Sequence, residues 1–415
     1  MSRSRATWLG GVVLILPALL GAGGCAPGPR TAAKDAFFHN DFAAAQELYA
    51  QQKDKLDRDF VLYNLEYASA AFEGGDYYNA RYALERASQV MRGYAGNTEG
   101  IISLIANESA KLFKGDPFEQ AMANFYDGLI YYRWGDYYNA AAAFRQALMC
   151  DKYSAENYRD DFAIVQYFVG RCYLKTNDPD NARVSFEAAR KVYPNNPYFS
   201  DDAIANHNVI IVLQLGRAPV KVATGPAGSI DDYDRGHYRE TMATVYANGK
   251  LLGNSSLAVD LLKQATTSGR SAKDTIQGVK GGLKTGAVAA GEMLATNDDK
   301  KTQGVGLILL LAGLLYPAQA DLRQWDLLPG EIHVLTAKLE PGTYTFKIDF
   351  CENAVPVDGM RQIWHYVPVN AEGDTLLVFR SGRGRANGYM PPEQRPVFQR
   401  QAEQTVAKTD GEAAP

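Results

Sequence analysis

The sequence predicts an α+β protein, in which an N-terminal α-helical solenoid of helix pairs precedes a small antiparallel β-sandwich domain with a helical insertion. Three observations lead to this prediction. The hexapeptide Gly-Asp-Tyr-Tyr-Asn-Ala occurs at 75–80 and again at 135–140. Each copy opens an Ala-rich amphipathic stretch, and a repeated helix–turn–helix unit is typical of solenoids that hold other proteins. After about residue 200, short β-branched runs separated by Gly and Pro replace the helical periodicity.

Residues 1–25 have the plan of an export signal. Two arginines precede an apolar run over 8–20, which is shorter than a membrane span requires. Small residues then precede Cys25, and this arrangement resembles the lipobox of bacterial lipoproteins. The resemblance implies that Cys25 carries lipid chains such as palmitate, and Ala26 after it favours the periplasmic face of the outer membrane of a Gram-negative bacterium. A secretory signal with an incidental cysteine is the alternative.

Residues 26–199 are expected to form the helical repeats. Small and bulky positions recur at fixed spacing, most clearly at Gly128, Tyr131, Ala140, Phe144 and Ala147, and again at Gly170, Tyr173, Ala182, Phe186 and Ala189. This series is similar to the Gly-x2-Tyr and Ala-x3-Phe pattern of the tetratricopeptide repeat. The copy that contains 75–80 is looser, and a degenerate unit begins near Asn40. An ordinary helical bundle is the alternative.

The resemblance to tetratricopeptide arrays implies that protein partners bind to first-helix residues on the concave surface. In the two clearest repeats, aromatic, Leu and Arg side chains of the kind that anchor a peptide stand at these positions. The candidate partner-binding residues are Phe125, Leu129, Tyr132, Tyr167 and Arg171. Packing between repeats is the alternative use of the same side chains.

Residues 200–380 are predicted to form the β-sandwich. Asn248-Gly249 supplies the positive φ angles of a type I′ turn, so residues 244–253 are expected to form a hairpin. Alternation along 339–350 places Tyr344, Phe346, Ile348 and Phe350 on one face. The remaining strand candidates are 208–215, continuing to 219–221, then 332–338, 363–367 and 375–380.

The insertion at about 260–320 is helical in pattern, and residues 304–316 are almost wholly apolar. This run is too short to span a bilayer. We expect it to be buried against the rest of the chain, and a membrane-contacting or self-associating hairpin is the alternative. The segment 381–415 has no periodicity and is predicted to be disordered.

No catalytic or metal-binding pattern is found. The five histidines are scattered, and no nucleophile motif or phosphate loop is complete. We therefore expect a protein without enzymatic activity, cofactor or metal, and the net charge of −4 gives no reason to expect nucleic acid. Cys150 and Cys172 could form a disulfide, or could serve as small buried hydrophobic residues.

The motif Asp-x-Arg-x-Trp-x-x-Leu-Pro at 321–329, with Pro-Gly-x-Tyr at 341–344, resembles a family of bacterial lipoproteins of largely uncharacterised function. These join tetratricopeptide repeats to a β-rich C-terminal region, and related lipoproteins are thought to occur beside activators of cell-wall synthases. The resemblance implies a protein-interaction scaffold in an envelope or cell-wall assembly process. A peptidoglycan- or carbohydrate-binding module is the alternative, with Trp325, Trp364 and Tyr366 stacking on sugar rings.

Overall fold

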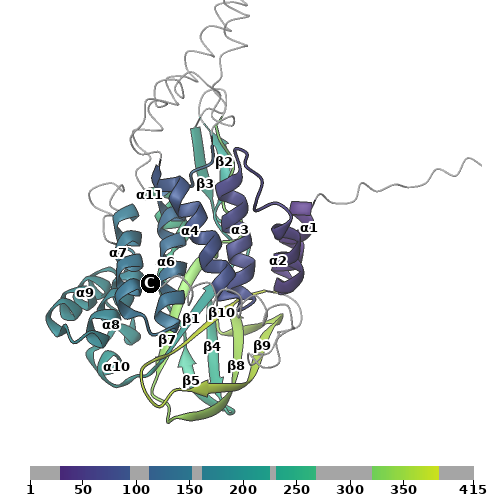
Figure 1. Cartoon of the computed structure of the whole chain (residues 1–415). Helices are drawn as coiled ribbons and strands as arrows, with labels where there is room; N and C mark the ends of the chain where they lie inside the picture. Colours follow the sequence, from purple (N-terminus) through teal and green to yellow (C-terminus); the bar gives the residue numbers. More distant parts are fainter. Residues whose placement is uncertain (1–28, 94–111, 152–160, 225–229, 268–319, 383–415) are drawn as a thin grey trace, which may run out of the picture.

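A computed structural model describes residues 29–93, 112–151, 161–224, 230–267 and 320–382 (Figure 1). The expected signal segment with Cys25, the apolar run 304–316 and the tail from 383 lie outside the described residues. The N-terminal half consists of paired helices, called the array below. The pairs are α1 (Pro29–Phe38) with α2 (Phe42–Ala50), α3 (Phe60–Glu73) with α4 (Tyr77–Gly93), α6 (Pro117–Arg133) with α7 (Tyr137–Asp151), and α8 (Ala163–Lys175) with α9 (Pro179–Val192).

Close packing between a glycine and a phenylalanine holds two of these pairs together. A Cβ atom on Gly128 would lie 2.5 Å from the ring of Phe144, and one on Gly170 would lie 2.7 Å from the ring of Phe186. No side chain fits at such distances, so the first helix of each pair needs glycine at this position. The spacing expected for tetratricopeptide repeats therefore corresponds to a physical contact.

The hexapeptide forms the turn between the helices of a pair. Its glycine has a positive φ, +79° at Gly75 and +77° at Gly135, which glycine adopts without strain. Its aspartate then caps the second helix: the Asp136 carboxylate accepts hydrogen bonds from the backbone N–H of Asn139 at 3.1 Å and from its side-chain amide at 2.7 Å. Asp178 and Asn181 repeat this cap in the next pair.

Beyond the array, η3 (Pro197–Phe199) and α10 (Asp201–Asn206) lead into the C-terminal region, residues 209–382. One sheet has the strand order β10-β1-β7-β6 and a second has the order β5-β4-β8-β9. The first sheet contains β1 (Val209–Leu215), β6 (Ser256–Asp260), β7 (Glu331–Ala337) and β10 (Thr375–Arg380). The second sheet contains β4 (Met242–Ala247), β5 (Lys250–Asn254), β8 (Gly342–Glu352) and β9 (Val355–Val369). A separate ribbon pairs β2 (Val220–Thr224) with β3 (Ile230–Asp234), and α11 (Leu261–Thr267) follows β6.

The expected sandwich is not purely antiparallel. β1 pairs with β7 in the antiparallel sense, but it pairs with β10 in the parallel sense, with Val209 opposite Thr375. Every residue of β1 is buried, as is usual for a strand covered on both faces. A continuous apolar run of this kind indicates burial but says nothing about the direction of the neighbouring strand, which is why this part of the prediction was wrong.

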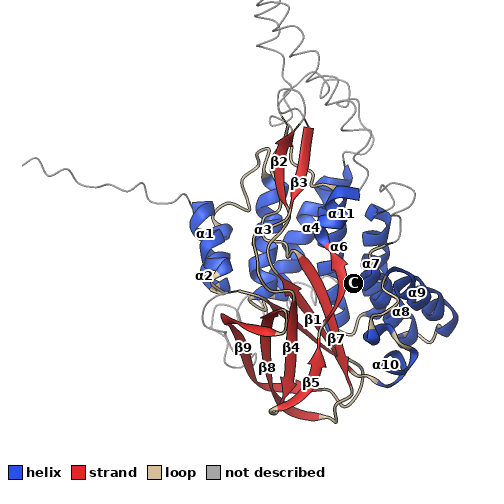
Figure 2. Ribbon diagram, turned by 180° about the vertical axis from the view of Figure 1, so that it is seen from behind, coloured by secondary structure: helices blue, strands red, loops and turns tan. Residues whose placement is uncertain are grey.

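The molecule has three layers: the array, the first sheet and the second sheet (Figures 1 and 2). Alternate residues of β1 face opposite ways, because Ile210 and Val212 pack into the core shared with the array, whereas Ile211 and Leu213 pack against the second sheet. Residues of β10 divide in the same manner. The array and the C-terminal region therefore share one hydrophobic core.

The predicted hairpin is confirmed. β4 and β5 are joined by Asn248 and Gly249, with φ angles of 46° and 80°. On β8, Phe346, Ile348 and Phe350 are fully buried on one face, as the alternation predicted.

Cys172 is a buried free thiol, so the Cys150–Cys172 bridge is not formed, and Cys150 instead lies 3.8 Å from the side-chain amide of Asn124. Within the described ranges, no helix combines the length and the apolar character that crossing a bilayer needs.

Candidate functional site

The five candidate partner-binding residues are buried by the chain itself. Their exposed fractions are small: Phe125 0%, Leu129 1%, Tyr132 3%, Tyr167 0% and Arg171 3%. Phe125 packs against the rings of Phe144 and Phe168. Tyr167 stacks on Phe199, with ring centroids 5.3 Å apart. Packing within the chain therefore accounts for Phe125 and Tyr167, and partner binding by this set stays a prediction.

Tyr132 and Arg171 meet at a carboxylate of the C-terminal region. Asp374, directly before β10, receives hydrogen bonds from the guanidinium of Arg171 at 2.6 and 3.0 Å and from the hydroxyl of Tyr132. The ammonium of Lys175 lies 2.9 Å from the same carboxylate, whose side chain is 1% exposed. Burial alone would raise the pKa of Asp374, but these cations and hydrogen bonds outweigh it and hold the pKa below its usual value.

The Asp-x-Arg-x-Trp motif makes a second contact with the inner side of the array. The backbone N–H of Trp325 donates to Glu119 at 2.5 Å, and its indole N–H donates to Ser69 at 2.9 Å. Arg323 reaches Asp59 at 2.7 Å. The motif therefore joins the C-terminal region to α3 and α6.

The burial of Trp325 in this contact matters for the alternative in which the C-terminal region binds peptidoglycan or carbohydrate. Trp325 is 1% exposed, so its indole is not open to a sugar ring. Trp364 packs against Phe379 with centroids 4.3 Å apart. Tyr366 is 74% exposed. An aromatic platform made of all three rings is therefore not formed.

Aromatic side chains are exposed elsewhere on the array, along the edge formed by the turns within the helix pairs. The exposed fractions are 42% for Tyr78, 57% for Tyr82, 39% for Trp134 and 76% for Tyr138. Tyr78 and Tyr138 are the second tyrosines of the two hexapeptides. The ring of Tyr78 lies against the indole of Trp134 in the next repeat, with centroids 5.0 Å apart. We call these four residues, together with Thr176, the turn-edge surface.

The turn-edge surface contains a hollow where the aromatic series stops. Trp134 and Thr176 occupy the same position in consecutive repeats, because each is the C-cap of the first helix of its pair. The indole of Trp134 lies beside Tyr78. At the equivalent place beside Tyr138 the chain has Thr176, which carries no ring. A hollow of about 240 Å³ is found there, lined by Tyr137, Tyr138, Lys175 and Thr176 among others. The missing ring thus leaves space beside an exposed tyrosine.

Sequence reasoning missed this surface because the tyrosines of the hexapeptide were used only to recognise the repeat. The position of the second tyrosine in the hexapeptide could have predicted that its side chain is exposed. The second tyrosine of each hexapeptide immediately precedes the asparagine of the cap, and the buried position of the helix is the following alanine, Ala80 or Ala140. Within the described residues, no three His, Cys, Asp or Glu side chains gather closely enough to hold a metal ion.

Comparison with known proteins identifies the repeat. The family model described as tetratricopeptide repeat matches residues 128–152. No curated protein matches the chain significantly. Solved structures similar to parts of the chain include MamA, at 15% identity over 39% of this chain and 74% of that chain, with a TM-score of 0.28.

Two further solved structures similar to parts of the chain are a complex of the TPR2AB domain of yeast Sti1 with pHSP90 and BtubC from P. vanneervenii. The first has 15% identity over 43% of this chain and 67% of that chain, with a TM-score of 0.22. The second has 18% identity over 39% of this chain and 77% of that chain, with a TM-score of 0.23. The assignment of the repeats rests on the family match and on the glycine–phenylalanine contacts described above.

Proposed function

We propose that this protein is a non-enzymatic interaction scaffold whose protein partner docks on the turn-edge surface of the array. The observation that carries the proposal is the hollow beside Tyr138, an exposed aromatic side chain with an unfilled space next to it. The concave face is a weaker candidate because the C-terminal region already covers it, through contacts such as that between Arg171 and Asp374.

The space beside Tyr138 suits one large aromatic side chain of a partner that also carries a polar group, because Asp136, Lys175 and Asn177 line the rest of the hollow. Such a side chain would lie against Tyr138 as Trp134 lies against Tyr78 in the repeat before. Exposed Tyr and Trp rings that receive a partner side chain commonly carry a large share of the binding energy. The partner we infer is therefore a protein that presents a large aromatic side chain with a polar group, such as Trp or Tyr, to this edge.

Filling the hollow from within the chain tests this proposal. Thr176→Trp places in the fourth pair the residue that the third pair already has, so the fold is expected to tolerate it. A photo-crosslinking residue at position 138 of the full chain should give a protein adduct in cells, and Thr176→Trp should reduce its yield at least about tenfold. Val184→Trp, at a 57% exposed position on α9, is the matched control and should leave the yield unchanged.

An adduct at 138 that is insensitive to Thr176→Trp would contradict docking at the hollow. The same conclusion would follow if a crosslinker at Tyr366, on the second sheet, gave the same adduct with equal yield. Both comparisons need the variants to be expressed and folded to the level of the parent protein.

We also propose that the scaffold is a lipoprotein, anchored through Cys25 to the periplasmic face of the outer membrane and active in an envelope or cell-wall process. The arrangement of charged, apolar and small residues over 1–25 supports this. Cys25→Ser is expected to move the protein from the membrane fraction to the soluble fraction of disrupted cells. Unchanged fractionation would rule out the anchor while leaving the turn-edge surface unaffected.

A further inference from the structure

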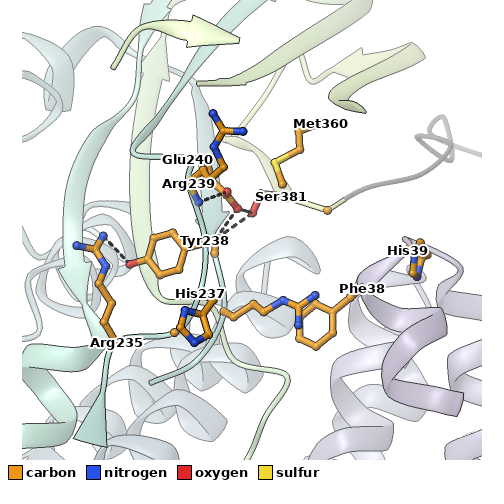
Figure 3. A pocket seen from close by; sticks show the side chains of 13 residues that line it. Phe38, His39, Arg235, His237, Tyr238, Arg239, Glu240, Met360 and Ser381 are labelled. Carbon is orange, nitrogen blue, oxygen red and sulfur yellow. Dashed lines mark hydrogen bonds between the residues drawn. The ribbon is translucent and has the colours of Figure 1, made fainter. Parts of the chain in front are cut away.

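A cavity of about 900 Å³ lies where the end of α1 meets the C-terminal region (Figure 3). Its walls come from stretches far apart in the sequence: 38–39 at the end of α1, 216–217 after β1, 235–240 before β4, Met360 of β9 and 381–382 after β10. Figure 3 shows Phe38 and His237 on one side of the cavity and Met360 with Ser381 on the other.

The cavity wall is rich in cationic and imidazole side chains. It contains Arg217, Arg235, Arg239, His39 and His237. Its one carboxylate, Glu240, is 2% exposed and accepts hydrogen bonds from the backbone N–H of Gly216 at 3.0 Å and from the hydroxyl of Ser381. These bonds hold the carboxylate in the wall without removing its charge. The buried guanidinium of Arg380 interacts electrostatically with Glu240 and balances part of that charge.

Arg217 is the cation best placed to hold an anion. Among the residues that the structure describes, Arg235 and Arg239 pair with Glu331 and Glu352, whereas no carboxylate lies within ion-pairing distance of Arg217. Its guanidinium instead lies over the ring of Phe38, 4.1 Å from the ring centroid. A guanidinium stacked by its face keeps its N–H edge available for paired hydrogen bonds to an oxyanion.

The backbone that carries Arg217 is held in a conformation that only glycine neighbours permit. Gly216 has a φ of +75°, and a Cβ atom on Gly236 would lie 2.3 Å from the carbonyl oxygen of Arg217. The segments 216–217 and 235–240 are therefore packed directly on each other. Arg217 is thus presented from a fixed position, which reduces the entropy lost when it binds a ligand.

We propose that this cavity binds a phosphate-bearing molecule, with the phosphate held by Arg217 and an apolar part lying against Phe38 and Met360. The volume leaves room beside the phosphate for further groups of the ligand. A phospholipid headgroup and a soluble phosphate ester share this chemistry. An anchor at Cys25 would hold α1, which begins at Pro29, close to the headgroups of the membrane.

Two sets of probes test the site on the full chain carrying Cys25→Ser. Inorganic phosphate and glycerol 3-phosphate are titrated by calorimetry, and phosphatidylcholine vesicles with and without phosphatidylglycerol are used for co-sedimentation. Arg217→Gln is expected to weaken binding at least about tenfold, because it removes a charge-assisted pair of hydrogen bonds. Arg183→Gln, whose side chain is 63% exposed on α9, is the matched control and should change nothing.

Binding that depends on Arg217 supports the site for either source of phosphate. Recruitment to phosphatidylglycerol vesicles identifies the lipid headgroup, whereas binding of glycerol 3-phosphate without recruitment identifies a soluble ester. Equal binding by the parent and by folded Arg217→Gln for every probe, or no binding of any probe by the parent, would overturn the proposal.

Discussion

The carboxylate of Asp374 receives contacts from three side chains of the array, Tyr132, Arg171 and Lys175. Arg171 also donates to the carbonyl oxygen of Ile204 at 2.7 Å. Each of the three guanidinium nitrogens therefore donates a hydrogen bond, but the charge of the group is balanced only while Asp374 is ionised. At the scale of single residues, this group links the array to the strand β10 that follows Asp374.

Asp374→Asn tests this link with a change of charge and almost none of size. The variant leaves the buried Arg171 without its counter-ion, and we expect a loss of about 3 kcal/mol in the free energy of unfolding. Urea denaturation followed by circular dichroism measures it. Asp201→Asn is the control, because Asp201 pairs with Arg190 at 94% exposure, and pairs of this kind contribute about 0–1 kcal/mol. Similar small losses in both variants would show that the Asp374 contact is not needed.

At the scale of elements, local signals in the sequence were sufficient for the helices and the hairpin. Gly128 and Phe144, sixteen positions apart, belong to one helix pair, and Asn248-Gly249 encodes its own turn. Arg171 and Asp374 are separated by 203 positions, and no spacing rule connects them. The parallel pairing of β1 with β10 is a contact of the same long-range kind.

For the candidate site, too, features set by nearby residues could be predicted from the sequence, and features set by distant residues could not. The exposure of Tyr138 follows from its place in a repeated turn, and the repeat could have indicated it. Phe125 is buried by packing within the array. Tyr132 also contacts Asp374 of the C-terminal region, and nothing in the sequence of the helices predicts this contact. The concave-face prediction used the repeat alone and therefore could not include the segment that covers this face.

At the scale of the whole molecule, buried carboxyl groups on array helices mark the contact with the C-terminal region. Burial raises the pKa of Glu73 and of Glu119 to about 7 each. Glu73 accepts a hydrogen bond from Gln214 of β1 at 2.7 Å, and Glu119 accepts one from Trp325. Both groups therefore hold a proton more tightly in the folded protein than in the unfolded chain, where the usual value is 4.5.

This difference gives stability a defined dependence on pH. Between about pH 4.5 and pH 7 the folded state binds more protons than the unfolded state, so the free energy of unfolding falls as pH rises through this window. Asp374 has a lowered pKa, so its contribution is lost as pH falls through that folded-state value, in a more acidic range. His207, whose burial lowers its pKa, acts with the opposite sign, and comparing variants at the same pH removes its contribution.

Glu73→Gln isolates one of these groups. Glutamine keeps the size and can still accept the hydrogen bond from Gln214, but it carries no charge at any pH. The groups facing position 73 are the buried guanidinium of Arg380 and the hydroxyl of Tyr126, joined through Gln214. In the parent protein the free energy of unfolding falls as the pH is raised from about 5 to about 8. We expect this fall to be smaller in the variant by on the order of 2 kcal/mol. Urea unfolding at the two pH values measures this, and an equal decrease in both proteins would mean that Glu73 is ionised without cost where it lies between the array and β1.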